Sequence, residues 1–196
     1  MEKMFHDEEV IIELKKNEIL FHDYDILEHV YYVIDGFVKI IKYTEEGNEK
    51  IIDLLGPKDF IAVTLLMENR DEYGLNGIVV KDCKLIKVSS KGMLEALTNL
   101  DTLKQYMDFQ SRKTLHFKNY ISISSENDEK LIGFLNGLAS RFGKIENDVK
   151  VLDLPINKTD LANFIGMRRE TLSRKLSNLT KQGILKVDKN KIYLKM

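Results

Sequence analysis

Residues 157–185 read NKTDLANFIGMRRETLSRKLSNLTKQGIL, and this stretch predicts two short helices joined by a tight turn. Asn157 is a favoured helix N-cap, and Asp160, three residues later, supports the first turn of the same helix. Gly166 permits the sharp turn that follows, because glycine adopts a positive φ without a steric penalty. Gly183 is expected to end the second helix in the left-handed conformation. The segment therefore predicts a helix-turn-helix.

The second helix has an apolar stripe and a polar arc on different sides. The stripe consists of Leu172, Leu176 and Leu179. The polar residues share an arc of about 140°, at roughly 100° per residue. They are Arg169, Glu170, Ser173 and Arg174. Arginine can bind guanine O6 and N7 in the major groove of DNA, and glutamate can accept from cytosine N4. The arc is thus predicted to read DNA bases; the alternative is a solvated helix face.

Basic residues near this helix indicate contacts with DNA phosphates. Ile184–Val187 and Lys191–Leu194 flank a short turn and predict a hairpin wing after the second helix. Lys189 and Lys191 of the wing, together with Lys175 of the second helix, are expected to contact phosphates.

The charge distribution along the chain supports this interpretation. Residues 157–196 hold ten Lys and Arg against three Asp and Glu, a net charge of +7, whereas residues 1–156 carry −8. A basic C-terminal segment on an otherwise acidic chain predicts a C-terminal module that binds a polyanion. A terminus that is merely basic is the alternative.

The first half of the chain reads as short strands rich in β-branched and aromatic residues. They are expected at 10–14, 18–21, 30–34, 37–43, 50–55, 78–80 and 84–88. Asp35-Gly36 predicts a tight hairpin, and Glu45–Asn48 and Gly56–Asp59 predict further turns. The expected fold class is α+β: an N-terminal antiparallel β-roll, a long helix, and a C-terminal winged helix-turn-helix.

A heptad seam on a long helix follows the strands. Its positions are Leu100, Leu103, Met107, Gln110, Thr114, Phe117 and Ile121. An adjacent row that begins with Tyr106 and Phe109 shares the spacing. One face of this helix is expected to pack on the roll and the other on a second copy of the chain. A single amphipathic helix on the monomer's own core is the alternative.

The remaining elements complete a three-part organisation. Ser124–Glu129 predicts a helix start, and that helix is expected to end near Phe142, before Gly143. Val149–Leu154 predicts a strand or an extended link. The expected domains are a β-roll sensor at 1–95, a dimerisation helix and hinge at 96–124, and a DNA-binding domain at 125–196.

With these motifs, the chain resembles the CRP/FNR family of bacterial transcription regulators. In the helix-turn-helix, the matching residues are Leu161-Ala162, Gly166, Arg169–Arg174, Leu176 and Gly183–Leu185. Glu18–Phe21 and Tyr31–Ile40 resemble the family's β-roll sensor. The resemblance implies a homodimer that binds double-stranded DNA at an inverted-repeat promoter site, with RNA polymerase as a further partner.

The resemblance also assigns roles to residues of the helix-turn-helix. It implies base reading by Arg169, Glu170 and Arg174 in half-sites with a TGA-like core, and Ser173 stands at a variable reading position.

Further residues are assigned to phosphate contacts. Thr159 and Thr171 match positions that touch phosphate. Arg168 departs from the family, which usually has Ser or Thr as the helix cap. Losing the cap oxygen costs about 0.5–2 kcal/mol, whereas the cation offers an extra phosphate contact.

The positions that cradle a cyclic nucleotide in the family have changed. Where the family has Gly-Glu and Arg-Ser pairs, this chain has Ala62-Val63 and Tyr73-Gly74, and only a shifted alignment brings in Arg70. Gating by cyclic AMP is therefore not expected, and the effector is unknown. A ligand-gated switch and a constitutively competent protein controlled by its abundance are both open.

Cys83 is the only cysteine of the chain. The iron–sulfur centre of the family's oxygen-sensing branch needs several thiolates, so that cofactor is excluded. Cys83 is expected in the core, with a redox switch as the alternative. The histidines show no metal-ligand spacing; they are His6, His22, His29 and His116. No metal and no cofactor are expected.

Composition excludes several other classes of protein. No apolar run approaches the roughly 18 residues of a membrane span, and the N-terminus lacks the apolar core of a signal peptide. A single cysteine fits the reducing cytoplasm. A cytoplasmic regulator without catalysis is expected; the rival is a β-roll enzyme or metal protein whose basic end serves another purpose.

Overall fold

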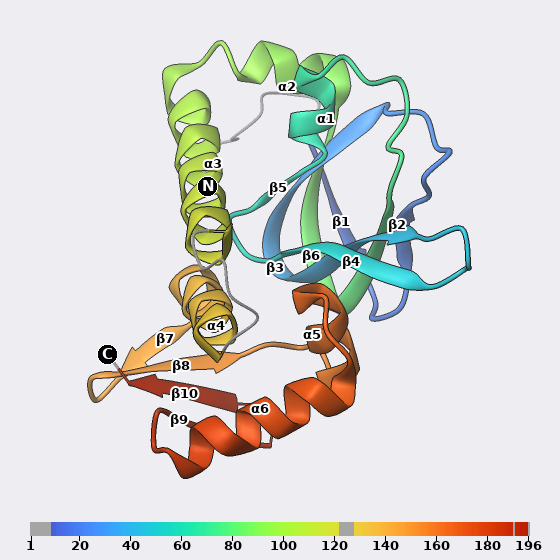
Figure 1. Ribbon diagram of the computed structural model, residues 1–196. Helices are drawn as coiled ribbons and strands as arrows, with labels where there is room; N and C mark the ends of the chain where they lie inside the picture. Colours follow the sequence, from blue (N-terminus) through green and yellow to red (C-terminus); the bar gives the residue numbers. More distant parts are fainter. Residues whose placement is uncertain (1–8, 122–127, 190, 196) are drawn as a thin grey trace. The chain divides into compact units, whose positions relative to one another are not determined.

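The chain forms two compact units, Met1–Phe109 and Gln110–Met196. Figure 1 shows the computed structural model, which describes residues 9–121, 128–189 and 191–195, and of 116–121 the backbone alone. Helix α3 (Leu100–Ile121) begins in the first unit and ends in the second. Every helix within the described ranges is too short or too polar to span a bilayer.

The N-terminal unit is an antiparallel β-roll. Its strands are β1 (Val10–Leu14), β2 (Ile19–Phe21), β3 (His29–Tyr43), β4 (Glu49–Leu55), β5 (Phe60–Ile61) and β6 (Asn76–Ser89). The sheet runs in the order β1-β6-β3-β4, with β2 paired to β6 and β5 to β3. Helices α1 (Val63–Met67) and α2 (Ser90–Ala96) follow β5 and β6. The antiparallel roll predicted from the strands is confirmed, as are the turns before β4 and before β5.

The hairpin predicted at Asp35-Gly36 is wrong. Both residues lie inside β3, which continues from His29 to Tyr43 and pairs with β6 through register shifts around Asp35. Gly36 has a φ of 91°, and a Cβ at this position would lie 2.3 Å from the carbonyl oxygen of Asp82. Gly36 therefore lies in a β-bulge where two backbones approach closely, and the chain does not reverse direction there. The strands predicted at 78–80 and 84–88 likewise form one strand, β6.

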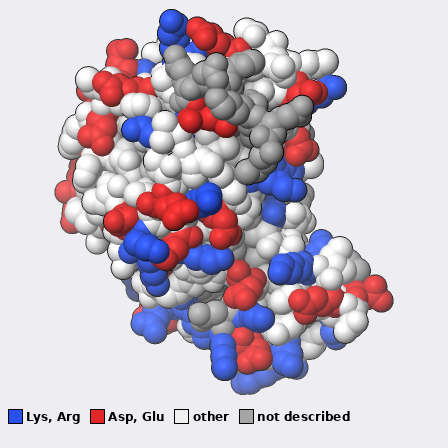
Figure 2. Space-filling model, turned by 180° about the vertical axis from the view of Figure 1, so that it is seen from behind, with Lys and Arg blue, Asp and Glu red and all other residues white. Residues whose placement is uncertain are grey.

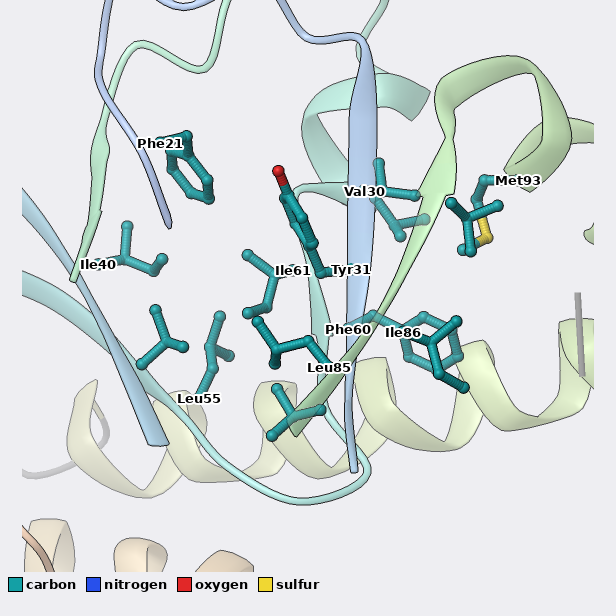
Figure 3. Close-up of a cluster of buried hydrophobic side chains, with 14 of the residues drawn as sticks. Phe21, Val30, Tyr31, Ile40, Leu55, Phe60, Ile61, Leu85, Ile86 and Met93 are labelled. Atoms are coloured by element: carbon teal, nitrogen blue, oxygen red, sulfur yellow. The ribbon is translucent and has the colours of Figure 1, made fainter. Parts of the chain in front are cut away.

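Apolar side chains of the roll and of α3 share one core. Figure 3 shows part of this core, including Val30, Phe60 and Leu85 of the roll. Val30 and Leu85 are completely buried on neighbouring strands. Phe60 packs edge-on against Tyr106 of α3, with ring centroids 5.5 Å apart, and lies 5.8 Å from the ring of Phe109. The prediction that one row of this helix packs on the roll is thus confirmed for Tyr106 and Phe109.

The C-terminal unit packs three helices with a small sheet. Its elements are α4 (Asp128–Phe142), β7 (Lys144–Glu146), β8 (Val149–Asp153), α5 (Lys158–Ile165), α6 (Arg169–Lys181), β9 (Leu185–Asp188) and β10 (Lys191–Lys195). The sheet order is β7-β8-β10-β9, all antiparallel. Helix α4 ends at Phe142 as predicted, whereas most of its predicted start, 124–127, lies outside the described residues.

The core of this unit consists mainly of leucine. Its largest fully buried side chains are Leu131, Leu135, Leu138, Leu152, Leu172 and Leu179. They come from α4, β8 and α6; helix α4 packs on β8, and helix α6 packs on α5 and β9.

Gly36→Ala is expected to lower the free energy of unfolding by about 2–4 kcal/mol, because the new Cβ would overlap the Asp82 carbonyl in a left-handed backbone. Gly47→Ala is the matched control. Gly47 also has a positive φ, 78°, but nothing lies within 4 Å of an added Cβ, so about 1 kcal/mol is expected. Chemical denaturation measures both variants, and equal destabilisation would contradict the close approach at Gly36.

Candidate nucleic-acid interface

Helices α5 and α6 begin and end where their sequence predicts. The side-chain oxygen of Asn157 accepts a hydrogen bond from the backbone N–H of Asp160 at 2.9 Å and caps α5. Gly166 ends α5 with a φ of 79°, which lets the chain turn into α6. Gly183, with a φ of 70°, follows α6. The predicted helix-turn-helix is therefore present.

Helix α6 buries one side and exposes another. The buried side, at most 4% exposed, consists of Leu172, Leu176 and Leu179. Arg169, Glu170 and Arg174 are exposed on another side, and Ser173 beside them is half-buried. We call these four residues the reading arc. Because the leucines fix the helix against the core of its unit, the reading arc faces solvent.

The entry to α6 carries an additional cation. Arg168 stands at the N-cap in an extended conformation, with φ −70° and ψ 144°, and its side chain makes no capping hydrogen bond. The side-chain hydrogen bond that a Ser or Thr cap would make is therefore absent at the start of α6, as the sequence predicts. Arg168 is exposed, as is Thr159 on the first turn of α5, whereas Thr171 on α6 is half-buried.

Strands β9 and β10 form the predicted wing. They pair antiparallel in a register that joins Lys191 to Asp188. Lys189 is exposed with a φ of 54°, and the next residue lies outside the described part of the chain. Lys191 is exposed and lies 3.7 Å from a carboxylate oxygen of Asp153. Both wing lysines thus stand at the solvent side of the hairpin.

Lys175 differs from the other residues predicted to contact phosphate. Its ammonium group donates a hydrogen bond to Asp128 Oδ1 at 2.8 Å, which joins α6 to the first residue of α4. The two side chains are 21% and 39% exposed. Sequence reasoning missed Asp128, because the pair is 47 residues apart and only tertiary packing brings its members together.

Exposed basic residues are frequent on α6 and the wing. Figure 2 shows Lys and Arg side chains gathered along the lower edge of the molecule, where α6 lies in Figure 1. The exposed cations of this segment are Arg168, Arg169, Arg174, Lys181, Lys186, Lys189, Lys191 and Lys195. Such a surface attracts a polyanion such as DNA.

Helix α3 leaves an apolar stripe in solvent beside the row that packs on the roll. Leu100 and Met107 are 63% and 54% exposed, and Leu103 between them is also exposed. Gln110 is half-buried and Thr114 is exposed. The side chains of the last two seam positions, Phe117 and Ile121, lie outside the described residues. The apolar surface of Leu100, Leu103 and Met107 is thus available for a partner.

The roll holds aromatic rings near the positions expected to cradle a nucleotide. Val63 is buried at the start of α1, and the buried ring of Tyr73 stacks on Phe21 with centroids 3.9 Å apart. The Tyr73 hydroxyl donates to the carbonyl oxygen of His29 at 2.6 Å, and burial raises its pKa. Arg70 is on the surface and pairs with a neighbouring carboxylate. These residues supply no carboxylate for a ribose and no inward guanidinium for a phosphate.

Cys83 behaves as a core residue. It is buried, and its Sγ lies 3.1 Å from the carbonyl oxygen of Lys81. Burial raises the pKa of the thiol to about 11, so the reactive thiolate is scarce near neutral pH. This favours the core role over a redox switch. Within the described ranges, no three His, Cys, Asp or Glu residues form a group that could hold a metal ion.

Comparison with known proteins agrees with this geometry. A family model described as a cyclic nucleotide-binding domain matches residues 11–99, and a Crp-like helix-turn-helix domain matches residues 129–195. The chain is 26% identical over 171 residues to the transcriptional activatory protein AadR of Rhodopseudomonas palustris, covering 86% of this chain and 70% of AadR. It is 26% identical over 187 residues to the global nitrogen regulator of a Nostoc species, covering 93% and 84%.

Solved structures share the fold. FixK2 from Bradyrhizobium japonicum matches with a TM-score of 0.77 at 21% identity, over 96% of this chain and 93% of FixK2. A CooA mutant from Carboxydothermus hydrogenoformans matches with a TM-score of 0.75 at 18% identity, over 96% and 84%. With both of its domains matched in order along the chain, the protein belongs to the CRP/FNR family of transcription regulators.

Proposed function

We propose that the protein is a homodimer that binds an inverted-repeat promoter site through the reading arc of each α6. The observation that carries this proposal is a helix whose leucine stripe is buried while Arg169, Glu170 and Arg174 face solvent. In the major groove, the two arginines bind guanine O6 and N7, and Glu170 accepts from cytosine N4. Ser173 adds a contact that tunes the preference within a TGA-like half-site.

Phosphate contacts hold the helix in register on the duplex. The residues proposed for this role are Thr159, Arg168, Thr171, Lys189 and Lys191. Lys175 was expected among them, but its ammonium group pairs with Asp128 at 2.8 Å, which supports a different role for this residue.

The exposed stripe on α3 supports dimerisation. In the proposed dimer, Leu100, Leu103 and Met107 pack against the same residues of a second copy, which removes their apolar surface from water. A two-fold axis then presents two recognition helices to half-sites about one helical turn apart.

The aromatic packing of the roll supports regulation without cyclic AMP, because Val63 and Tyr73, at positions expected to cradle the nucleotide, carry neither a carboxylate nor a guanidinium. We propose that the regulator acts in the cytoplasm through DNA and RNA polymerase, and without catalysis.

Nanomolar binding of DNA by metabolite-free protein would favour control by abundance over an obligate effector. Stoichiometric metal in the purified protein would instead favour a metal-dependent β-roll protein.

Arg174→Ala is expected to weaken binding to the specific site by about 1–3 kcal/mol per subunit, because a forked contact to guanine is lost. Lys189→Ala and Lys191→Ala should weaken all sequences alike and flatten the salt dependence by about one unit per lost phosphate contact. Titrations of specific and scrambled duplexes at several salt concentrations separate the two effects. Equal weakening of both duplexes by Arg174→Ala would place this residue on a phosphate and contradict the proposed placement of α6.

Met107→Glu is expected to dissociate the dimer at micromolar concentration, because it puts a charge into the apolar seam. Leu115→Glu is the matched control. Leu115 is 60% exposed on the same helix, but its heptad position faces away from the seam. Sedimentation of both variants and the wild type measures the effect, and a monomeric wild type with and without DNA would contradict the seam.

Arg168→Ser is expected to raise the free energy of unfolding by about 0.5–2 kcal/mol, because serine restores the missing helix cap. The same change should weaken DNA binding and flatten its salt dependence, since a phosphate contact is lost. Arg168→Gln removes the charge without adding a strong cap, so it should weaken binding with little gain in stability. DNA affinity unchanged in both variants would show that Arg168 makes no phosphate contact.

A further inference from the structure

Lys175 points away from the reading arc. At about 100° per residue, it lies roughly 170° around α6 from the centre of that arc. It stands instead beside the buried leucine stripe, where its side chain is only 21% exposed. Its ammonium group meets the carboxylate of Asp128 at 2.8 Å. Lys175 is therefore directed at another part of its own unit, and not toward the surface that would face DNA.

Asp128 is well placed to fix α6. It is the first residue of α4, and α4 is held in the core of the C-terminal unit by Leu131, Leu135 and Leu138. A partly buried ion pair is screened less by salt and water than an exposed pair. The Lys191–Asp153 pair of the same unit illustrates the contrast, since its atoms are 3.7 Å apart and its side chains are 50% and 58% exposed.

We propose that Asp128 and Lys175 are positioning residues for base reading, and that their ion pair sets the rotation of α6 about its axis. This inference rests on the proposed function, in which Arg169 and Arg174 bind base edges. A forked contact between arginine and guanine requires close alignment, because functional groups must lie within about 0.5 Å and 10–20° of their productive geometry. Contacts from long lysines to phosphates tolerate a larger displacement. Loss of the pair should therefore impair recognition of sequence more than attraction to DNA.

The test uses the full-length protein and two duplexes, one that the wild type selects from a random-sequence pool and one with the same bases scrambled. Asp128→Asn and Lys175→Gln are each expected to lower affinity for the selected duplex about five- to tenfold, with the scrambled duplex within about twofold of wild type. The double variant should be no weaker than the weaker single variant, because both remove the same interaction. Asp128→Glu keeps the carboxylate and should restore most of the discrimination.

Glu129→Gln is the matched control, because Glu129 is an exposed carboxylate in the same first turn of α4. It removes the same charge from the same helix terminus and should leave discrimination unchanged. Thermal unfolding of every variant is recorded in parallel. If a variant loses affinity equally for both duplexes and its thermal unfolding midpoint falls, the ion pair has only a structural role. That result would overturn the inference.

A second outcome would also overturn it. If Lys175 contacts a phosphate when DNA is bound, Lys175→Gln will weaken both duplexes alike and reduce the salt dependence by about one unit, and Asp128→Asn will not weaken either duplex. A wild type that selects no duplex at all would overturn the proposed function, and this inference with it. A wild type that discriminates, with variants that discriminate equally well, would overturn the positioning role alone.

Discussion

The burial of one leucine stripe on α6 determines what the C-terminal unit presents to solvent. Leu172, Leu176 and Leu179 are buried in the core of that unit, where α6 packs on α5 and β9, and each fully buried leucine contributes about 1.5–3 kcal/mol. A helix held in this way cannot turn freely about its axis. The side that carries Arg169, Glu170 and Arg174 is therefore fixed toward solvent, and the ion pair of Lys175 with Asp128 adds a polar restraint to the same orientation.

The same principle organises the N-terminal unit. Tyr106 and Phe109 place one face of α3 in the core around Phe60, which leaves the neighbouring stripe with Met107 in water. The roll thus positions an exposed apolar seam, which supports the proposed dimer. Its interior carries the stacked rings of Tyr73 and Phe21 and a hydroxyl bonded to the backbone, so the chain has the fold of a cyclic nucleotide-binding domain with an aromatic stack at a position expected to cradle the ligand.

Local rules predicted the parts of the fold that depend on a few neighbouring residues. The cap at Asn157 and the turn at Gly166 are confirmed, because both act within one helical turn. The hairpin predicted at Asp35-Gly36 is wrong, because the same dipeptide also suits a β-bulge. Which of the two forms depends on pairing with β6, some 45 residues away. The partner of Lys175 was missed for a similar reason. The spacing of residues along α6 predicts which side of the helix faces solvent. It does not predict which residue, distant in sequence, contacts the other side.

Chemical protection of guanine N7 in the protein–DNA complex tests the central claim most directly, because N7 lies in the major groove and methylating reagents also report on adenine N3 in the minor groove. With α6 in the major groove, we expect N7 protection in two half-sites about one helical turn apart, lost at the contacted guanine with Arg174→Ala. Protection confined to adenine N3, or unchanged N7 reactivity in a saturated complex, would contradict base reading by α6.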